Sequence, residues 1–380
     1  MKILYVTTIS DSMVFFPRHI EMLLDQGNFV DLACNVTKPI NPFLLKRGCK
    51  VFNIAFARNP FNKENYMAYK ALKSLISREN YNIVHTHTPT ASVCVRLACR
   101  DMKNVKVFYT AHGFHFFTGA PIINWLLYYP VERWLSRFTD VLVTINQEDY
   151  QRATKSFKAR RVAYVPGVGI DIERFRNVAI DKTAKRQEIS VPYNALILLS
   201  VGELIKRKNH ETIIKTIARL NEANIYYLIC GSGQMEEYLR GLIAELGLEK
   251  QVILLGPRND IKEICKIADI FIHPSFQEGL PVALMEAMAS GLPCIASRIR
   301  GNTDLIQDVK GGYLCKPDDV DGFRQAIERL AADESTRRLM GEYNQDKIMD
   351  FDISRILLEM KSLYEREWEQ ENQNITSITQ

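Results

Sequence analysis

Long apolar runs are missing from this sequence. Nowhere in its 380 residues does a stretch approach the roughly 20 apolar residues that a membrane-spanning helix needs. The first ten residues, MKILYVTTIS, also lack the apolar core and cleavage site of a signal peptide, because Thr7 and Thr8 end the apolar run. We therefore expect a cytoplasmic protein without a membrane span.

Paired cysteines are missing as well. The eight cysteines are scattered along the chain, no two of them form a C-x-x-C pair, and most have apolar neighbours. This pattern is not that of a zinc site or a disulfide framework, and we expect reduced thiols in the protein core.

Acidic residues are scarce in the first part of the chain. Residues 1–165 hold 22 Lys and Arg against 11 Asp and Glu, a balance of +11, and the remainder has a balance of −6. A basic half indicates a partner with negative charge, such as anionic lipid headgroups or a phosphorylated acceptor. A solvated surface rich in lysine explains the asymmetry equally well, and no nucleic-acid-binding motif accompanies it.

Short runs of Val, Ile and Leu alternate with helical patterns in two successive series. The first series ends near Pro166, and the second begins with ALILLSVG. Such series predict two α/β domains, each a doubly wound, Rossmann-like parallel sheet, facing each other across a cleft. We expect residues 1–168 to form the first domain and 169–352 the second, with an amphipathic helix at 353–380 packing back on the first.

The segment 115–138 is unusually rich in aromatic residues. We interpret it as a loop followed by a helix that packs on the core. The alternative is a surface that touches a membrane interface or a lipid-linked acceptor, since Trp and Tyr suit that boundary.

Residues 273–288, HPSFQEGLPVALMEAM, are the most informative stretch. They predict a strand that ends at Pro274, a turn, and a helix that begins near Pro281. The free N–H groups and the dipole at this helix start, around Gly279, Leu280 and Pro281, would stabilise a bound phosphate.

Two glutamates lie in the same stretch. Glu278 falls in the turn, and Glu286 lies eight residues later, within the helix. Ionised carboxylates accept strong hydrogen bonds, so each glutamate could hold sugar hydroxyls. Generic buried or surface glutamates would explain either residue alone, but hardly the whole stretch.

Two glycine turns follow the first strands of the second series. In VGELIKRKN, Gly202 precedes a basic run that ends at Lys208, an arrangement suited to phosphate. In CGSGQME, Gly231 and Gly233 resemble the start of a dinucleotide fingerprint, but Glu236 stands where the third glycine belongs. A dehydrogenase is therefore disfavoured.

Histidines end two strands of the first series. His112 precedes Gly113 at the end of a strand, a position that favours a functional role over a structural one. We interpret His85 and His87, in VHTHTP, as structural or acceptor-side residues.

Together these motifs resemble the family-4 glycosyltransferases, whose motif is a glutamate, seven residues and a second glutamate in the context E-G-x-P. Glu278 and Glu286 match that motif. The resemblance covers nearly the whole chain and is closest to transferases of bacterial exopolysaccharide and capsule clusters. It implies the glycosyltransferase type B (GT-B) fold, transfer that retains anomeric configuration, and no requirement for a metal or other cofactor.

The resemblance also implies roles for single residues of the donor site. Glu278 would contact the transferred sugar and Glu286 the ribose, and Lys208, six residues after the glycine turn, would bind phosphate. Glu203 replaces the usual arginine, so Lys206 or Arg207 would supply the second cation.

Three further positions match the family. His112 would lie against the donor sugar, the turn at Gly231 and Gly233 beside the nucleotide, and Arg258 beside the base.

The predicted function is transfer of a hexosyl or N-acetylhexosaminyl group from a nucleotide sugar, by resemblance a UDP-sugar, to a lipid-linked saccharide in cell-surface polysaccharide biosynthesis. The enzyme would be cytoplasmic, on the inner membrane face, with its basic half on anionic lipid. Lys208 and the helix start would stabilise the departing diphosphate, which can itself take the acceptor's proton. A nucleotide-sugar epimerase of the same fold and a non-catalytic sugar-binding protein are the alternatives.

Overall fold

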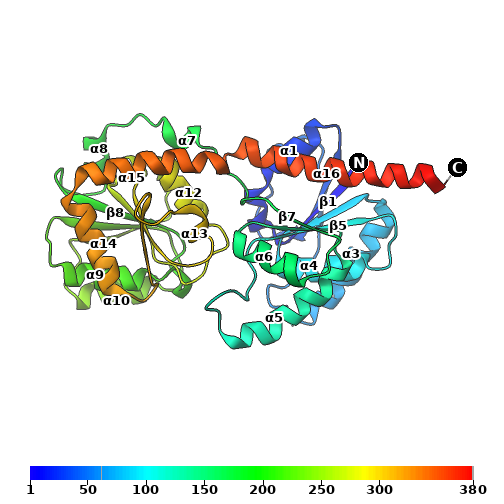
Figure 1. Ribbon diagram of the computed structural model, residues 1–380, viewed down its shortest axis with the longest axis horizontal. Coiled ribbons are helices and arrows are strands. Elements are labelled where there is room, and N and C mark those ends of the chain that lie inside the picture. The colour runs from blue at the N-terminus through cyan, green and yellow to red at the C-terminus, as the bar shows by residue number, and fades with distance from the viewer. Residues whose placement is uncertain (61, 379–380) are drawn as a thin grey trace. The chain divides into compact units, whose positions relative to one another are not determined.

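The computed structural model describes residues 1–60 and 62–378. The chain divides into two compact units: unit 1 contains Met1–Gly169 and Ser354–Gln380, and unit 2 contains Ile170–Ile353. Each unit is built on a parallel sheet with helices on both of its faces (Figure 1). The prediction of two doubly wound α/β sheets is therefore confirmed.

The sheet of unit 1 has seven strands among the described residues, in the order β3-β2-β1-β4-β5-β6-β7, and all neighbours pair in parallel. The strands are β1 (Lys2–Ile9), β2 (Phe29–Asn35), β3 (Val51–Asn53), β4 (Ile83–Thr86), β5 (Lys106–Ala111), β6 (Val141–Thr144) and β7 (Arg161–Tyr164). The helices are α1 (Pro17–Asp25), α2 (Pro42–Lys46), α3 (Glu64–Glu79), α4 (Pro89–Cys99), α5 (Ile122–Leu135), α6 (Gln147–Ser156) and α16 (Ile353–Ile378), with 3-10 turns η1 (Ser10–Phe15) and η2 (Ser136–Phe138).

Strand β1 shows why the strands read as uniformly apolar. Ile3 and Tyr5 pack into one core cluster, and Leu4 and Val6 pack into a second cluster that contains residues of α3 and α4. Because successive side chains of a strand point to opposite faces, a sheet covered on both sides needs apolar residues at every position.

The C-terminal helix α16 packs back on unit 1, as predicted. Ile356, Met360 and Tyr364, which recur every four residues, belong to the same core cluster as Ile3 and Tyr5 of β1. This spacing places them on one face of the helix. The last two residues of the predicted helix, 379 and 380, lie outside the described residues.

The sheet of unit 2 has six strands among the described residues, in the order β10-β9-β8-β11-β12-β13, again all parallel. The strands are β8 (Leu196–Val201), β9 (Ile225–Cys230), β10 (Val252–Gly256), β11 (Ile270–His273), β12 (Cys294–Ser297) and β13 (Gly312–Cys315). The helices are α7 (Glu173–Arg176), α8 (Lys182–Glu188), α9 (His210–Leu220), α10 (Glu236–Glu245), α11 (Ile261–Ile267), α12 (Val282–Ala289), α13 (Asn302–Leu305), α14 (Val320–Ala332) and α15 (Glu334–Lys347), with 3-10 turns η3 (Lys206–Lys208) and η4 (Ile348–Phe351).

All eight cysteines are buried and unpaired. Within residues 1–60 and 62–378, no helix combines the length and the apolar character needed to cross a membrane.

Candidate functional site

The strand order of unit 2 locates its candidate site. The chain starts the sheet at β8, adds β9 and β10 on one side, and then crosses to add β11 on the other. Because all these strands are parallel, the loops after β8 and β11 leave the same edge of the sheet in opposite directions. Open α/β sheets bind ligands at this point of reversal.

The carboxylate of Glu278, in the loop after β11, is held by three side chains. Lys208 places its Nζ 2.7 Å from Oε1, and Arg207, also from the loop after β8, places a guanidinium nitrogen 3.2 Å from Oε2. The Nε2 atom of His273, the last residue of β11, lies 3.3 Å from Oε1. The structure thus brings together two residues predicted as sugar and phosphate ligands, Glu278 and Lys208.

Charge decides the protonation state of this cluster. Burial raises the pKa of Glu278, but Lys208, His273 and Arg207 outweigh burial and hold that pKa well below its ordinary value. Burial also lowers the pKa of His273. At neutral pH the site therefore contains an ionised carboxylate, two cations and a neutral imidazole. The carboxylate can accept hydrogen bonds from hydroxyls, and the cations can attract an anion.

Hydrogen bonds that involve backbone groups fix the loops after β8 and β11 against each other. The N–H of Phe276 donates to the carbonyl of Arg207 at 2.8 Å, and the Arg207 guanidinium donates to the carbonyl of Gln277 at 2.7 Å. The Asn209 amide donates to the carbonyl of Pro274 at 2.9 Å. Of the two candidates for the second cation, it is Arg207 whose side chain contacts Glu278.

A third loop, after β12, contacts the backbone of Glu278. Buried Arg300 donates from Nε to the backbone carbonyl of Glu278 at 3.0 Å. The next residue, Gly301, has a φ of +82°, and a Cβ there would lie 2.4 Å from the carbonyl oxygen of Gly279. A glycine at this position therefore lets the third loop approach the Glu278 loop closely.

Helix α12 begins directly after the loop that contains Glu278. Its N-cap is Pro281, which follows Gly279 and Leu280 and whose side chain has no hydrogen-bonding group. The cap therefore leaves N–H groups of the first helical turn available to an anion. Glu286 lies in the second turn, where burial raises its pKa to about 7 and the charge of Arg174 opposes that rise.

The predicted glycines Gly202, Gly231 and Gly233 allow the loops after β8 and β9 to pack closely. A Cβ on Gly231 would lie 1.8 Å from the carbonyl oxygen of Gly202, and one on Gly233 would lie 2.5 Å from that of Leu204. A Cβ on Gly202 would lie 3.2 Å from the Cε atom of Lys208. The loops after β8 and β9 are thus closely packed against each other, and Gly202 in the first of them lies next to Lys208.

Arg258, predicted beside the base, is engaged in an ion-pair network. Its guanidinium lies 2.6 Å from Glu188 and 2.5 Å from Asp260. Lys185 pairs with the same two carboxylates and with Glu263. A contact between Arg258 and a nucleotide base stays a prediction.

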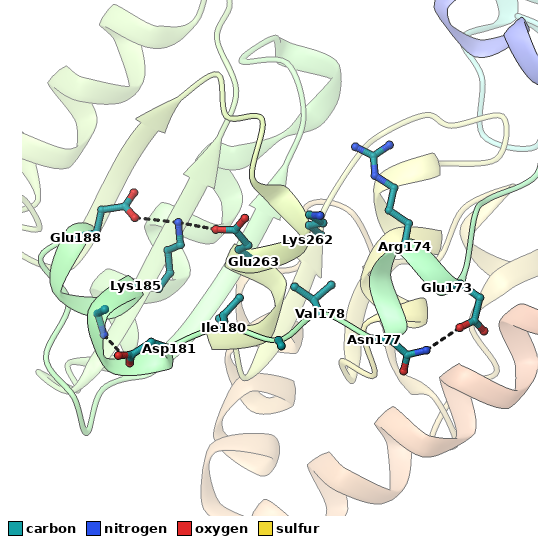
Figure 2. Close-up of a pocket in the computed structure, with 12 residues that line it drawn as sticks. Glu173, Arg174, Asn177, Val178, Ile180, Asp181, Lys185, Glu188, Lys262 and Glu263 are labelled. Atoms are coloured by element: carbon teal, nitrogen blue, oxygen red, sulfur yellow. Dashed lines mark hydrogen bonds and ion pairs between the residues drawn. The ribbon is translucent and has the colours of Figure 1, made fainter.

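A pocket of about 630 Å³ lies next to this network. It is lined by α7, α8, α11 and the segment between α7 and α8 (Figure 2). Lys185 lies between Glu188 and Glu263 at its wall (Figure 2). The residues that line the pocket do not include Glu278, Lys208 or Arg207, so the pocket is separate from the cluster described above.

In unit 1 the predicted residue His112, itself half-buried, contacts a cluster of buried histidines. Its Nε2 lies 3.3 Å from Nδ1 of His87, which follows β4. Burial lowers the pKa of His112 to about 4 and that of His87 well below its ordinary value. His112 is therefore a neutral hydrogen-bonding group at pH 7. His85 hydrogen-bonds Tyr364 of α16 and Thr110 of β5, so both ring nitrogens have partners within unit 1.

Three residues that contact the Glu278 loop were not predicted. His273 stands at the start of the motif itself, and Asn209 directly follows Lys208, so both lay within stretches already singled out. Arg300 gives a weaker signal, a basic residue before a glycine shortly after a strand. His273 reaches Glu278 within one loop, whereas the contacts of Asn209 and Arg300 with the Glu278 loop depend on the order of the strands.

Two family models match this chain. The model described as glycosyl transferases group 1 matches residues 181–347, which include Lys208, Glu278 and Glu286. The model described as glycosyl transferase 4-like matches residues 2–146, which include His112.

Curated relatives match most of the chain. EpsD of Bacillus subtilis (strain 168), named as a glycosyltransferase, is 38% identical over 319 residues, which cover 82% of this chain and 84% of that protein. A second relative is an Escherichia coli enzyme named UDP-Gal:alpha-D-GlcNAc-diphosphoundecaprenol alpha-1,3-galactosyltransferase. It is 28% identical over 352 residues, which cover 90% of each protein.

A solved structure shares the fold of the whole chain. HepE of Anabaena in complex with UDP and glucose aligns with a TM-score of 0.81 and 18% identity, over 96% of this chain and 100% of that chain. At this identity the likeness shows the fold, which is GT-B.

Proposed function

The chain belongs to the group 1 glycosyltransferases, and we propose that it transfers a sugar, with retention of configuration, from a UDP-sugar to a lipid-linked saccharide. The observation that carries this proposal is the ionised Glu278 carboxylate between Lys208 and Arg207, at the strand reversal of unit 2. One cluster thereby offers acceptors for sugar hydroxyls and cations for a diphosphate. We propose synthesis of a cell-surface polysaccharide as the process it serves.

The proposed roles follow from charge. Glu278 accepts hydrogen bonds from the transferred sugar, Glu286 holds the ribose, and Lys208 and Arg207 stabilise the negative charge that grows on the diphosphate. The bond from the anomeric carbon to the phosphate oxygen breaks while the acceptor oxygen bonds to the same face. The departing diphosphate takes the acceptor's proton, so no side chain has to act as a strong base.

Donor and acceptor are proposed from the relatives. The E. coli relative is named for UDP-Gal and a diphosphoundecaprenol acceptor, and the HepE structure contains UDP. We propose the same two classes for this chain. A lipid-linked acceptor also gives a reason for the balance of +11 in residues 1–165, which we propose rests on an anionic membrane surface.

We further propose that transfer needs no metal ion. In metal-assisted phosphoryl chemistry the ion neutralises the leaving oxygens. Here the cations of Lys208 and Arg207 and the N-terminus of α12 supply positive charge at one place. Turnover should therefore persist in EDTA.

The first test is a thermal-shift panel of UDP, GDP and ADP with EDTA present. We expect UDP to raise the melting temperature of the wild type and to have little effect on Lys208→Ala, because only the folded state binds the nucleotide. Lys215→Ala is the matched control, since Lys215 pairs with Glu211 on the surface of the same unit. Stabilisation that requires a divalent metal would contradict the metal-free proposal.

The second test measures sugar transfer to a lipid diphosphate saccharide. Glu278→Ala should lower kcat by about 100-fold or more, because the contact with the reacting sugar is lost. Full turnover in Glu278→Ala would overturn the assignment of that residue. Donor conversion without an acceptor would instead favour an epimerase, and the anomeric configuration of the product tests retention.

A further inference from the structure

Helix α5 exposes an apolar face on the surface of unit 1. The face consists of six large side chains that are 45% to 78% exposed: Ile122, Ile123, Leu126, Leu127, Val131 and Trp134. At about 100° per residue these positions fall on one half of the helix. Figure 1 shows α5 at the outer edge of its unit.

The opposite face of α5 already anchors the helix. Trp125, Tyr128 and Tyr129 pack against the core cluster that contains Phe114 and Phe116. The expected core-packing helix is therefore present, but packing accounts for only one of its two faces. A helix that is apolar all round is normally covered on all sides.

A buried ion pair holds the same inner face. Glu132 of α5 accepts from the guanidinium of Arg96 in α4 at 2.8 and 3.2 Å. Because α5 is fixed from the inside, its outer apolar face is not needed to keep the helix in place.

Basic side chains gather at the C-terminal end of the apolar face. A pocket of about 210 Å³ is lined there by Tyr129, Pro130, Arg133, Trp134, Arg137 and Lys158. The three cationic residues of this lining are exposed. Arg and Lys can extend their charged ends to phosphate groups while their apolar stems lie along a hydrophobic surface, and Trp favours the same boundary.

We propose that α5 lies in the headgroup region of an anionic lipid bilayer, with its apolar face toward the acyl chains and Arg133, Arg137 and Lys158 on lipid phosphates. A helix with an apolar face flanked by cations suits that position. A second copy of the chain is a poorer occupant, because an interface through the same face would bring identical cations together. This contact rests on the membrane association proposed above and gives it a defined surface.

The first experiment tests the apolar face. Cosedimentation measures binding to phosphatidylcholine vesicles with and without phosphatidylglycerol. Leu126→Asp should weaken binding to the anionic vesicles by about tenfold or more, because an anion replaces a leucine that the bilayer would cover. Leu358→Asp is the matched control, since Leu358 of α16 has the same 66% exposure, and it should bind like the wild type. Equal melting temperatures of the two variants show that both fold.

The second experiment tests the cations. The triple change of Arg133, Arg137 and Lys158 to Gln should weaken anionic-vesicle binding by about 100-fold, at about 1 kcal/mol per charge near the surface. The same triple change at Arg78, Arg100 and Lys103 removes equal charge from exposed positions elsewhere in residues 1–165.

The outcomes separate this contact from the proposal on which it rests. Wild type that binds neutral and anionic vesicles equally contradicts membrane association altogether. A second outcome is a wild type that prefers anionic vesicles while Leu126→Asp binds them as well as Leu358→Asp, or while the two triple variants bind them equally. This outcome overturns α5 as the contact and leaves membrane association standing. A wild-type dimer that Leu126→Asp converts to a monomer would assign the apolar face to a second copy of the chain.

Discussion

Two glutamates eight residues apart have opposite pKa shifts. Glu278 lies among Lys208, Arg207 and His273 and is held ionised. Glu286 lies in α12, where burial dominates and raises its pKa to about 7. Groups of one type that the environment separates in this way can serve different tasks in a site. Glu278 is suited to act as a permanent anion, and the charge of Glu286 depends on pH near neutrality.

Compared with the wild type, the Glu286→Gln variant should become more stable in unit 2 as pH rises. The folded-state pKa of Glu286, about 7, lies above its ordinary value of 4.5, so folding favours the protonated carboxyl. Its contribution to stability is present below about pH 4.5 and is lost as pH rises through about 7. Without a correction for solvent screening, this loss of unfolding free energy is at most about 3 kcal/mol. The measurement is the difference in unfolding free energy between variant and wild type at several pH values, and a constant difference would contradict the assignment.

Arg300 should act by positioning the Glu278 loop. Arg300→Ala removes the donor to the Glu278 carbonyl, and we expect kcat to fall by about 10- to 100-fold, because a small displacement of a reacting contact is expensive. The affinity for UDP should change by less than about threefold, since Lys208 and Arg207 remain. Arg298→Ala is the control, because Arg298 pairs with Asp308 at the surface. Weaker UDP binding with kcat unchanged would assign Arg300 a different role.

At the scale of elements, the site depends on how closely four loops pack. The loops after β8 and β11 are joined by hydrogen bonds to backbone carbonyls. The loop after β9 contacts the one after β8 through Gly231, and the loop after β12 contacts Gly279 through Gly301. The approaches at Gly231 and Gly301 are closer than a side chain allows. The geometry around Glu278 is therefore a property of the carboxyl edge of the sheet rather than of one loop.

Gly231→Ala should destabilise unit 2 by about 2–4 kcal/mol, because its Cβ would overlap the backbone carbonyl of Gly202. Gly241→Ala should instead stabilise by about 0.5–1 kcal/mol, since Gly241 lies within α10 and has no neighbouring atom within 4 Å of an added Cβ. Denaturant unfolding of both variants checks the pair. Similar stability of the two proteins would show that the loops after β8 and β9 can separate freely.

At the scale of the whole chain, neutral histidines with lowered pKa values contribute to the response to mild acid. Six of the seven histidines have pKa values lowered by burial: His19, His85, His87, His112, His210 and His273. They occur in both units. Unfolding exposes these rings and returns their pKa values to about 6.5.

The chain should therefore lose stability as pH falls below about 6.5. The lowered folded-state values mean that the unfolded chain binds more protons, so the stability present above about 6.5 is lost toward about 4, the folded-state pKa of His112. Urea unfolding midpoints across this range provide the measurement. His112→Asn should reduce the slope. A midpoint that stays constant from about pH 7 to pH 5 would contradict the neutral buried cluster.

Much of this protein follows from local pattern. Apolar runs alternating with helical periods predicted two parallel α/β sheets, because a strand buried on both faces must be apolar at each position. The stretch 273–288 and the basic run at 206–208 predicted where anions and hydroxyls would bind, since helix starts and glycine turns expose N–H groups. These signals are short in range and can be read along the chain.

Only the tertiary structure decided how those segments meet. Glu278 and Lys208 are 70 residues apart, and their contact follows from β8 and β11 being neighbours in the sheet. The same packing brings Arg207 to Glu278, engages Arg258 with acidic residues and separates the pKa values of Glu278 and Glu286. It also leaves one face of α5 exposed. Burial and electrostatic partners depend on residues distant in the sequence, so periodicity and composition determined the elements and the fold determined their chemistry.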